Sequence, residues 1–112
     1  MMGRGKATSS RLRQRLTLQQ EVQTPDSAGG YTRSWQDVAS LWAEIVPVSG
    51  REAWFAGQLQ SEVTHKILLR YRSGVSAGMR LLFESRVFAI RYVMNVREEN
   101  ELLELLAQEG VA

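Results

Sequence analysis

The stretch SEVTHKILLRYRSGV, residues 61–75, alternates between apolar and polar side chains. A period of two is the spacing of an extended strand, in which every second side chain points to the same face. One face can then pack against a core while the other meets water. The segment therefore predicts a half-exposed antiparallel strand over residues 62–72. Its apolar face would carry Val63, His65, Ile67, Leu69 and Tyr71.

The same period occurs in residues 11–22, where leucine and valine occupy even positions and arginine, threonine and glutamine most of the odd ones. The following TPDSAGGY contains proline, aspartate and paired glycines, which favour a turn. Residues 31–48 are apolar on both faces from Leu41 onward, a pattern typical of a strand that is covered on two sides. Pro47 cannot donate a ladder hydrogen bond, so we expect this strand to end, or to lie at an edge, there.

Two further segments, residues 79–83 and 87–96, predict a hairpin around residues 84–86. One face of its second strand would carry Phe88, Ile90, Tyr92, Met94 and Val96. The later ELLELLAQEG fits helical spacing at some leucines and strand spacing at others, so the period leaves both structures open.

Between the second and third predicted strands, residues 49–52 have the S-x-x-E form of a capping box, and the following AWFAGQLQS favours a short helix. The predicted fold class is mainly β: a small antiparallel β-barrel of about six strands with one short helix inserted between strands. The 112 residues, 44% of them hydrophobic, suit a single domain. We expect this domain over residues 11–112, with a helix-bearing excursion at about 49–61. Residues 1–10, small and basic, predict a flexible N-terminal arm.

Residues that could carry chemistry are sparse. The chain has no cysteine and a single histidine, His65, whose neighbours two positions away are Val63 and Ile67. A general base needs an orienting partner, and zinc needs more than one imidazole with scattered carboxylates. The sequence contains no phosphate-binding glycine motif and no apolar run near the roughly 18 residues that span a bilayer. We therefore expect no enzymatic activity, catalytic residue, metal site, cofactor or membrane partner.

Basic and aromatic residues are interleaved at Arg70, Tyr71 and Arg72, as in small barrels such as OB-folds that bind single strands. A small nucleic-acid-binding β-barrel therefore stays open as an alternative function. Trp54 and Phe55 would either cap the open end of the barrel or protrude into another subunit as interface anchors.

Charge is unevenly placed along the chain, although the net charge is only +2. Basic residues gather in the first 15 positions, and acidic residues follow Arg97 without a further base. This polarity suits contacts between copies or stacked partners, and it equally fits two solvated ends.

The order of these features resembles the phage head-tail joining family, the head-closure or stopper proteins of long-tailed phages. The resemblance covers about residues 11–107. It begins with the basic strand RLTLQ and a glycine-bearing turn, and it continues from LWAEIVPVSG to FAIRYV. The residues that carry it are Trp42-Ala43, Ser49-Gly50-x-Glu52, Thr64-His65, Arg70-Tyr71-Arg72, Met79-Arg80 and Arg86-Val87-Phe88-x-Ile90.

The resemblance implies a structural connector that forms a homo-oligomeric ring between portal or adaptor proteins and the tail terminator or tail proteins. Such a ring would retain the packaged double-stranded DNA and let it pass at ejection, without sequence-specific binding. The implied location is the head-tail interface of a virion or a gene-transfer particle, assembled in the bacterial cytoplasm. On this pattern the run from Leu103 to Leu105 would be a closing strand.

Side chains on the outer surface would then meet a neighbouring copy, the DNA conduit or solvent. The candidates for inter-subunit or lumen contacts are Arg11, Arg13, Arg15, Arg51, Trp54, Phe55, Lys66, Arg70 and Arg72.

Overall fold

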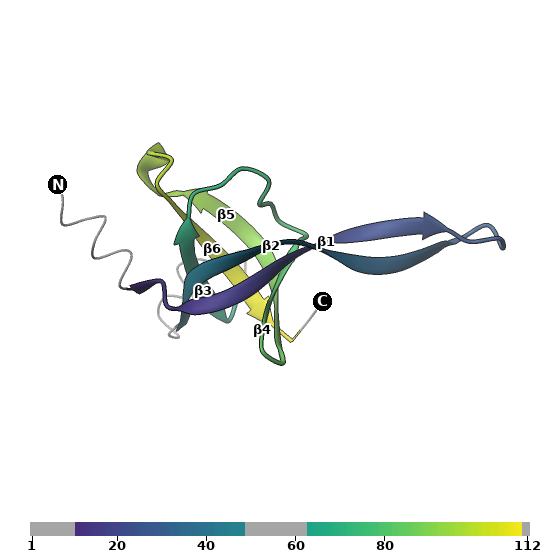
Figure 1. Cartoon of the computed structure of the whole chain (residues 1–112), viewed down its shortest axis with the longest axis horizontal. Coiled ribbons are helices and arrows are strands. Elements are labelled where there is room, and N and C mark those ends of the chain that lie inside the picture. The colour runs from purple at the N-terminus through teal and green to yellow at the C-terminus, as the bar shows by residue number, and fades with distance from the viewer. Residues whose placement is uncertain (1–10, 49–62, 111–112) are drawn as a thin grey trace.

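The computed structural model describes residues 11–48 and 63–110, and these form one antiparallel sheet of six strands (Figure 1). A single 3-10 turn, η1, joins the last two strands, and the described residues contain no α-helix. The strands and the turn are β1 (Gln14–Pro25), β2 (Tyr31–Pro47), β3 (His65–Arg70), β4 (Arg80–Phe83), β5 (Arg86–Asn95), η1 (Val96–Glu98) and β6 (Leu102–Glu109).

The strand order is β1-β2-β3-β6-β5-β4, and β4 pairs back with β1 through Thr17 and Leu82. The pairing therefore closes on itself, although the strands do not lie evenly around one axis. The prediction of a mainly β, antiparallel, six-stranded chain is confirmed, whereas an even barrel is not shown. The predicted helix and the whole excursion at 49–61 lie outside the described residues.

Every strand contributes apolar side chains to one core. The largest side chains that are almost fully buried are Leu16, Leu18, Ile67, Leu69, Leu81, Phe88, Ile90 and Leu105. Complete burial of a side chain of this size stabilises the fold by about 1.5–3 kcal/mol. Of the inward residues predicted for residues 62–72, Val63, Ile67 and Leu69 are buried in the core. His65 is only partly buried, and Tyr71 is exposed.

The C-terminal leucines form a strand, so the closing strand implied by the family resemblance is correct. β6 pairs with β3 on one side and with β5 on the other. Leu103 and Leu105 point into the core, and Leu106 on the opposite face is also buried. Burial on both faces explains why the leucine spacing had no clean period of two.

Two bulges shift which side chains face the core. One extra residue is Val38 of β2, opposite the step from Leu18 to Gln19 in β1, and the other is Arg91 of β5, between Ile90 and Tyr92. An extra residue in one strand moves the following side chains to the other face. The predicted inward face of residues 87–96 is therefore correct to Ile90 and wrong beyond it: Tyr92 is 39% exposed, while Val93 packs on the core.

Two other predicted core positions are also wrong. Tyr71 lies beyond the end of β3 and is 40% exposed, so it does not pack in the core. Trp42 is 52% exposed on β2, so the stretch after Leu41 is not covered on both sides. Its ring instead lies beneath the guanidinium of Arg15, 4.9 Å away. The prediction that β2 ends at Pro47 is confirmed.

The β1–β2 hairpin projects far beyond the rest of the sheet (Figure 1). The molecule measures 57 × 29 × 27 Å, and its distal ribbon makes up much of the long dimension. We call residues 20–36 the extension and the remaining described residues the body. The extension pairs from Gln20 with Gln36 to Pro25 with Tyr31. Its turn is held by Asp26, whose Oδ1 accepts hydrogen bonds from two backbone amides, those of Ala28 and Gly30.

Candidate interaction surfaces

Within residues 11–48 and 63–110, no group of three or more histidine, cysteine, aspartate or glutamate side chains is placed to hold a metal ion. The same residues include no helix long and apolar enough to cross a bilayer. The candidate surfaces are clusters of charged side chains and exposed apolar side chains, which we describe one by one.

His65 lies at the end of the body where β3, β5 and β6 meet. Its Nε2 accepts a hydrogen bond from Arg86 Nη2 at 3.4 Å, and its Nδ1 lies 2.9 Å from Thr64 Oγ1. With the proton on Nδ1, the imidazole donates to Thr64, whose hydroxyl lies 3.4 Å from the carbonyl of Ala107. The ring edge also contacts Phe88, with centroids 5.1 Å apart. Both ring nitrogens thus have partners within the fold.

An ion pair completes this cluster. Arg86 donates to both carboxylate oxygens of Glu109, at 2.9 and 3.2 Å, a geometry that strengthens such pairs. The hydrogen bond from Arg86 lowers the pKa of Glu109 and correspondingly raises the pKa of Arg86. Burial lowers the pKa of His65, opposed by Glu109 and supported by Arg86. A neutral imidazole that connects three strands supports a structural role for His65.

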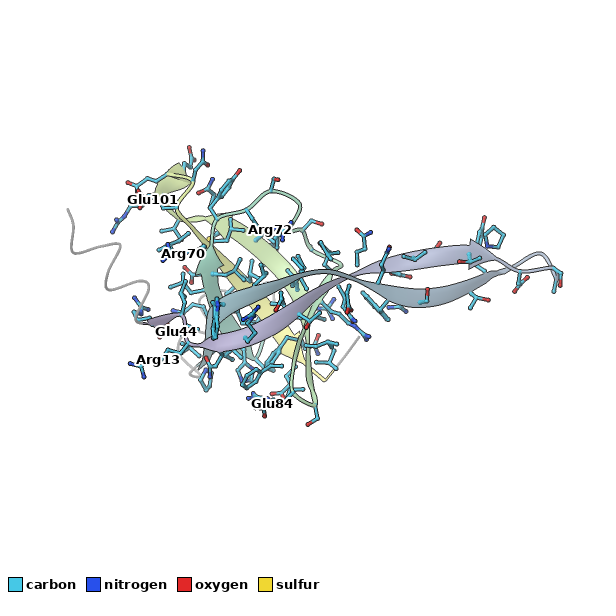
Figure 2. The ribbon with its side chains drawn as sticks, in the orientation of Figure 1. Arg13, Glu44, Arg70, Arg72, Glu84 and Glu101 are labelled. Atoms are coloured by element: carbon cyan, nitrogen blue, oxygen red, sulfur yellow. The ribbon has the colours of Figure 1, made fainter. Side chains whose placement is uncertain are left out.

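The first three candidate arginines lie at the end of the β1–β2 hairpin that is far from the extension. Arg11 forms an ion pair with Glu44 at 2.8 Å, and Arg15 Nε donates to Ser40 at 2.7 Å. A hollow of about 440 Å³ opens beside them. Figure 2 shows Arg13 and Glu44 at this end of the molecule. The described residues that line the hollow are Arg11, Arg13, Gln14, Glu44 and Ile45.

The remaining described candidates lie on and after β3. Lys66 approaches Glu104 of β6 at 3.9 Å. Arg70 is the last residue of β3, and Figure 2 places it near Glu101, whose carbonyl accepts the amide of Tyr71. Arg72 donates to the carbonyl of Ser73 in the following loop. Three further candidates, Arg51, Trp54 and Phe55, lie outside the described residues, so the structure does not test them.

Sequence reasoning missed a polar cluster where the extension leaves the body. Arg80 of β4 donates from Nε to Gln19 Oε1 at 2.7 Å, and Gln19 donates from Nε2 to Asp37 Oδ1 at 2.6 Å. The guanidinium of Arg80 also lies 4.2 Å from the ring centroid of Trp35. Gln19 is 92% buried, although its odd position in β1 predicted a solvent-facing side chain.

These features define a small antiparallel β protein whose distinctive parts are surfaces for contact. A model of the phage head completion protein family matches residues 8–110. The chain therefore belongs to that family, which confirms the predicted family and places the chain among the components of phage or phage-like particles. Membership of this family points to a structural role rather than an enzymatic one.

Individual relatives agree with this assignment. The chain is 28% identical over 72 residues to the head completion protein gp16 of Bacillus phage SPP1. That alignment covers 64% of this chain and 66% of gp16, just under two thirds of the relative.

Two solved structures share the fold. The solution structure of protein SF1141 from Shigella flexneri 2a has a TM-score of 0.73 and 32% identity, and the match covers 90% of this chain and 95% of that one. A chain in the virion of a native gene transfer agent particle has a TM-score of 0.67 and 30% identity, with coverage of 91% and 98%.

Proposed function

We propose that this chain is the stopper subunit of a head-tail connector. Copies of it would close into a ring between the portal or adaptor proteins and the tail, retain the packaged double-stranded DNA and give it a passage at ejection. The observation that carries the proposal is the similarity, across nine tenths of the chain, to a protein of a gene transfer agent virion. The family description, head completion, supports the same position in the particle.

The physical features of the body suit this role. A sheet whose strand pairing closes leaves few free edges and holds its shape under load, as a channel wall requires. Its surface carries charged side chains that pair with each other, for example Arg86 with Glu109 and Lys66 with Glu104. We further propose that the nine predicted contact residues, including Trp54 and Phe55, lie in contacts with neighbours or the lumen.

The test is genetic. Deletion of the coding sequence from a producing strain should give filled heads that lose DNA and lack tails, and expression of the wild-type chain should restore tailed particles. Electron microscopy of the particles, with quantification of nuclease-protected DNA, measures both effects. Tailed, DNA-retaining particles from the deletion strain would contradict the proposal.

A second candidate function, binding of nucleic acid by the isolated chain, gains from one observation. Tyr71 is exposed between Arg70 and Arg72, where a base could stack on its ring. In that case the purified chain would shift labelled DNA in a salt-dependent way, and Tyr71→Ser with Arg70→Ala would abolish the shift. A stopper predicts weak binding at physiological salt, because tight binding would hinder DNA passage.

A further inference from the structure

The extension lacks the support that the body strands have. Within the described residues, β1 pairs with β4 only at Thr17–Gln19, and β2 pairs with β3 only at Ala43–Pro47. Beyond these points the two strands of the hairpin have only each other. A two-stranded ribbon alone is marginally stable in water, and its unpaired edges favour contact with another chain.

The extension nevertheless leaves the body in a fixed direction. The hydrogen bonds from Arg80 to Gln19 and from Gln19 to Asp37 join β4, β1 and β2 at the point of departure. Arg80 also stacks over Trp35 at the start of the extension. Closer to the tip, Arg33 forms an ion pair with Glu21 at 3.0 Å. A ribbon that is held in one orientation loses less entropy when it docks.

The tip carries an aromatic side chain and one negative charge. Tyr31 is 69% exposed, the largest exposed fraction among the large hydrophobic residues described. Asp26 is the only charged residue between positions 25 and 32. An exposed tyrosine at the end of a projection is a typical interface anchor, because its ring buries much area when it docks.

A complementary surface lies at the other end of the same hairpin. Among the described residues, the hollow of about 440 Å³ is lined by two arginines, Arg11 and Arg13, and by one acid, Glu44. Along β1 and β2, the pair Gln14–Ala43 marks the end near the hollow, and the pair Pro25–Tyr31 marks the end near the tip. Eleven residue steps at about 3.3 Å place the two ends on the order of 36 Å apart, so one chain cannot fill its own hollow.

We propose that the tip of the extension docks into this hollow on a second copy of the chain, with Tyr31 seated in it and Asp26 facing Arg11 and Arg13. The occupant is argued from the opposite charges of tip and hollow and from their positions at opposite ends of one ribbon. Two different surfaces that fit each other make a head-to-tail contact, which closes into a ring when the rotation allows it. This inference rests on the proposed ring function and names the contact that would build the ring.

Disulfide trapping tests the contact directly, because the natural chain has no cysteine. The double variant Ser27→Cys with Arg13→Cys places one thiol in the turn and one at the hollow. After mild oxidation of assembled particles, non-reducing gels should show a ladder of covalent multiples. The matched control, Ser85→Cys with Arg13→Cys, moves the first thiol to the exposed β4–β5 turn and should give no ladder.

A second pair of variants removes the anchor. Tyr31→Ser should lower incorporation into particles at least tenfold, while Tyr92→Ser, the same change at an exposed tyrosine of the body, should leave it within twofold. Normal assembly of Tyr31→Ser into rings or tailed particles would overturn the tip-to-hollow contact. The absence of a covalent ladder from Ser27→Cys with Arg13→Cys would overturn it as well. Either result would leave the proposed stopper function standing. Particles that never need the chain would instead overturn the stopper function itself.

Discussion

β1 and β2 run through both the body and the extension, yet the two regions are stabilised by different interactions. In the body, Leu16 and Leu18 of β1 are completely buried against the other strands. In the extension, the same strand is half-buried or exposed at every position from Gln20 to Pro25. The comparison teaches that one hairpin can serve as a wall of a core at one end and as a projecting arm at the other.

The point of change is the bulge between Leu18 and Gln19. Before it, side chains alternate between core and solvent. After it, the ribbon has left the sheet, and a buried polar side chain, Gln19, takes the place of an apolar one. Bulges bend a strand and increase its twist, which lets the hairpin turn away from the body.

The largest expected difference in stability is between a variant in the core of the body and a variant at the tip of the extension. Phe88→Ala removes a fully buried ring from the centre of the body and should lower the free energy of unfolding by about 3–5 kcal/mol. Tyr31→Ala at the exposed tip should change it by less than about 0.5 kcal/mol. Chemical denaturation of both purified variants measures the difference. Equal effects would show that the extension is part of the folding core.

The next effect concerns the connection between the two regions. Arg80→Leu removes the hydrogen bond to Gln19 and the stacking on Trp35, which should cost about 1–3 kcal/mol because it leaves a buried amide short of a partner. Hydrogen exchange should rise at the amides of the extension more than in β3 and β6. Arg72→Leu, in an exposed loop, is the control and should alter neither region. Uniform exchange in Arg80→Leu would contradict a local role.

A pH effect should be confined to the body. Burial lowers the pKa of His65 in the folded state below its usual value of 6.5, so the unfolded chain binds more protons near that pH. The contribution of this group to stability is therefore present above pH 6.5 and is lost as the pH falls from 6.5 through the folded pKa. Thermal unfolding between pH 7.5 and 5 should show this loss. His65→Gln should flatten the dependence of the unfolding temperature on pH between 7.5 and 5. An unchanged slope in this variant would contradict the role of His65.

Below this window, Glu109 should add a second loss of stability. The hydrogen bond from Arg86 lowers the pKa of Glu109 in the folded state below 4.5, so its contribution is present above pH 4.5. The contribution disappears as the pH falls through the folded value. In thermal unfolding, Glu109→Gln should remove the loss of stability below pH 4.5 and keep the loss near pH 6.

The smallest expected change in stability comes from removing a surface ion pair, and each region offers one pair for comparison. Glu44→Gln breaks the pair with Arg11 in the body, and Glu21→Gln breaks the pair with Arg33 in the extension. Each should cost about 0.2–1 kcal/mol or less, and high salt should erase the difference from wild type. Denaturation at two salt concentrations checks both. A loss above 2 kcal/mol in either variant would show that its pair is part of a larger network.

Much of the body could be predicted from the sequence, because strands such as β1 and β3 have one buried and one more exposed face. The alternation in β1 and β3 identified Leu16, Leu18, Ile67 and Leu69 as inward residues, and all four are buried. The β4–β5 hairpin was also predicted at the correct place, with its turn at Glu84 and Ser85. The errors at Tyr92 and Met94 follow a bulge, which reverses the faces without a residue type that marks it.

The contact surfaces were predictable only in part. The three arginines at the start of the chain were identified from their charge, but nothing in their spacing showed that Glu44, about thirty residues later, completes the hollow. The cluster around Gln19 was missed for the same reason, since its partners Asp37 and Arg80 come from two other strands.

The sequence by itself determined the family, most of the strands and most of the apolar side chains that form the core, since period and composition act within a few residues of one another. Only the tertiary structure decided where the hairpin leaves the sheet, which aromatic side chains reach solvent and which charges meet. These outcomes depend on strand register and on pairing between residues far apart in the chain, and a shift of one residue is enough to exchange a buried side chain for an exposed one.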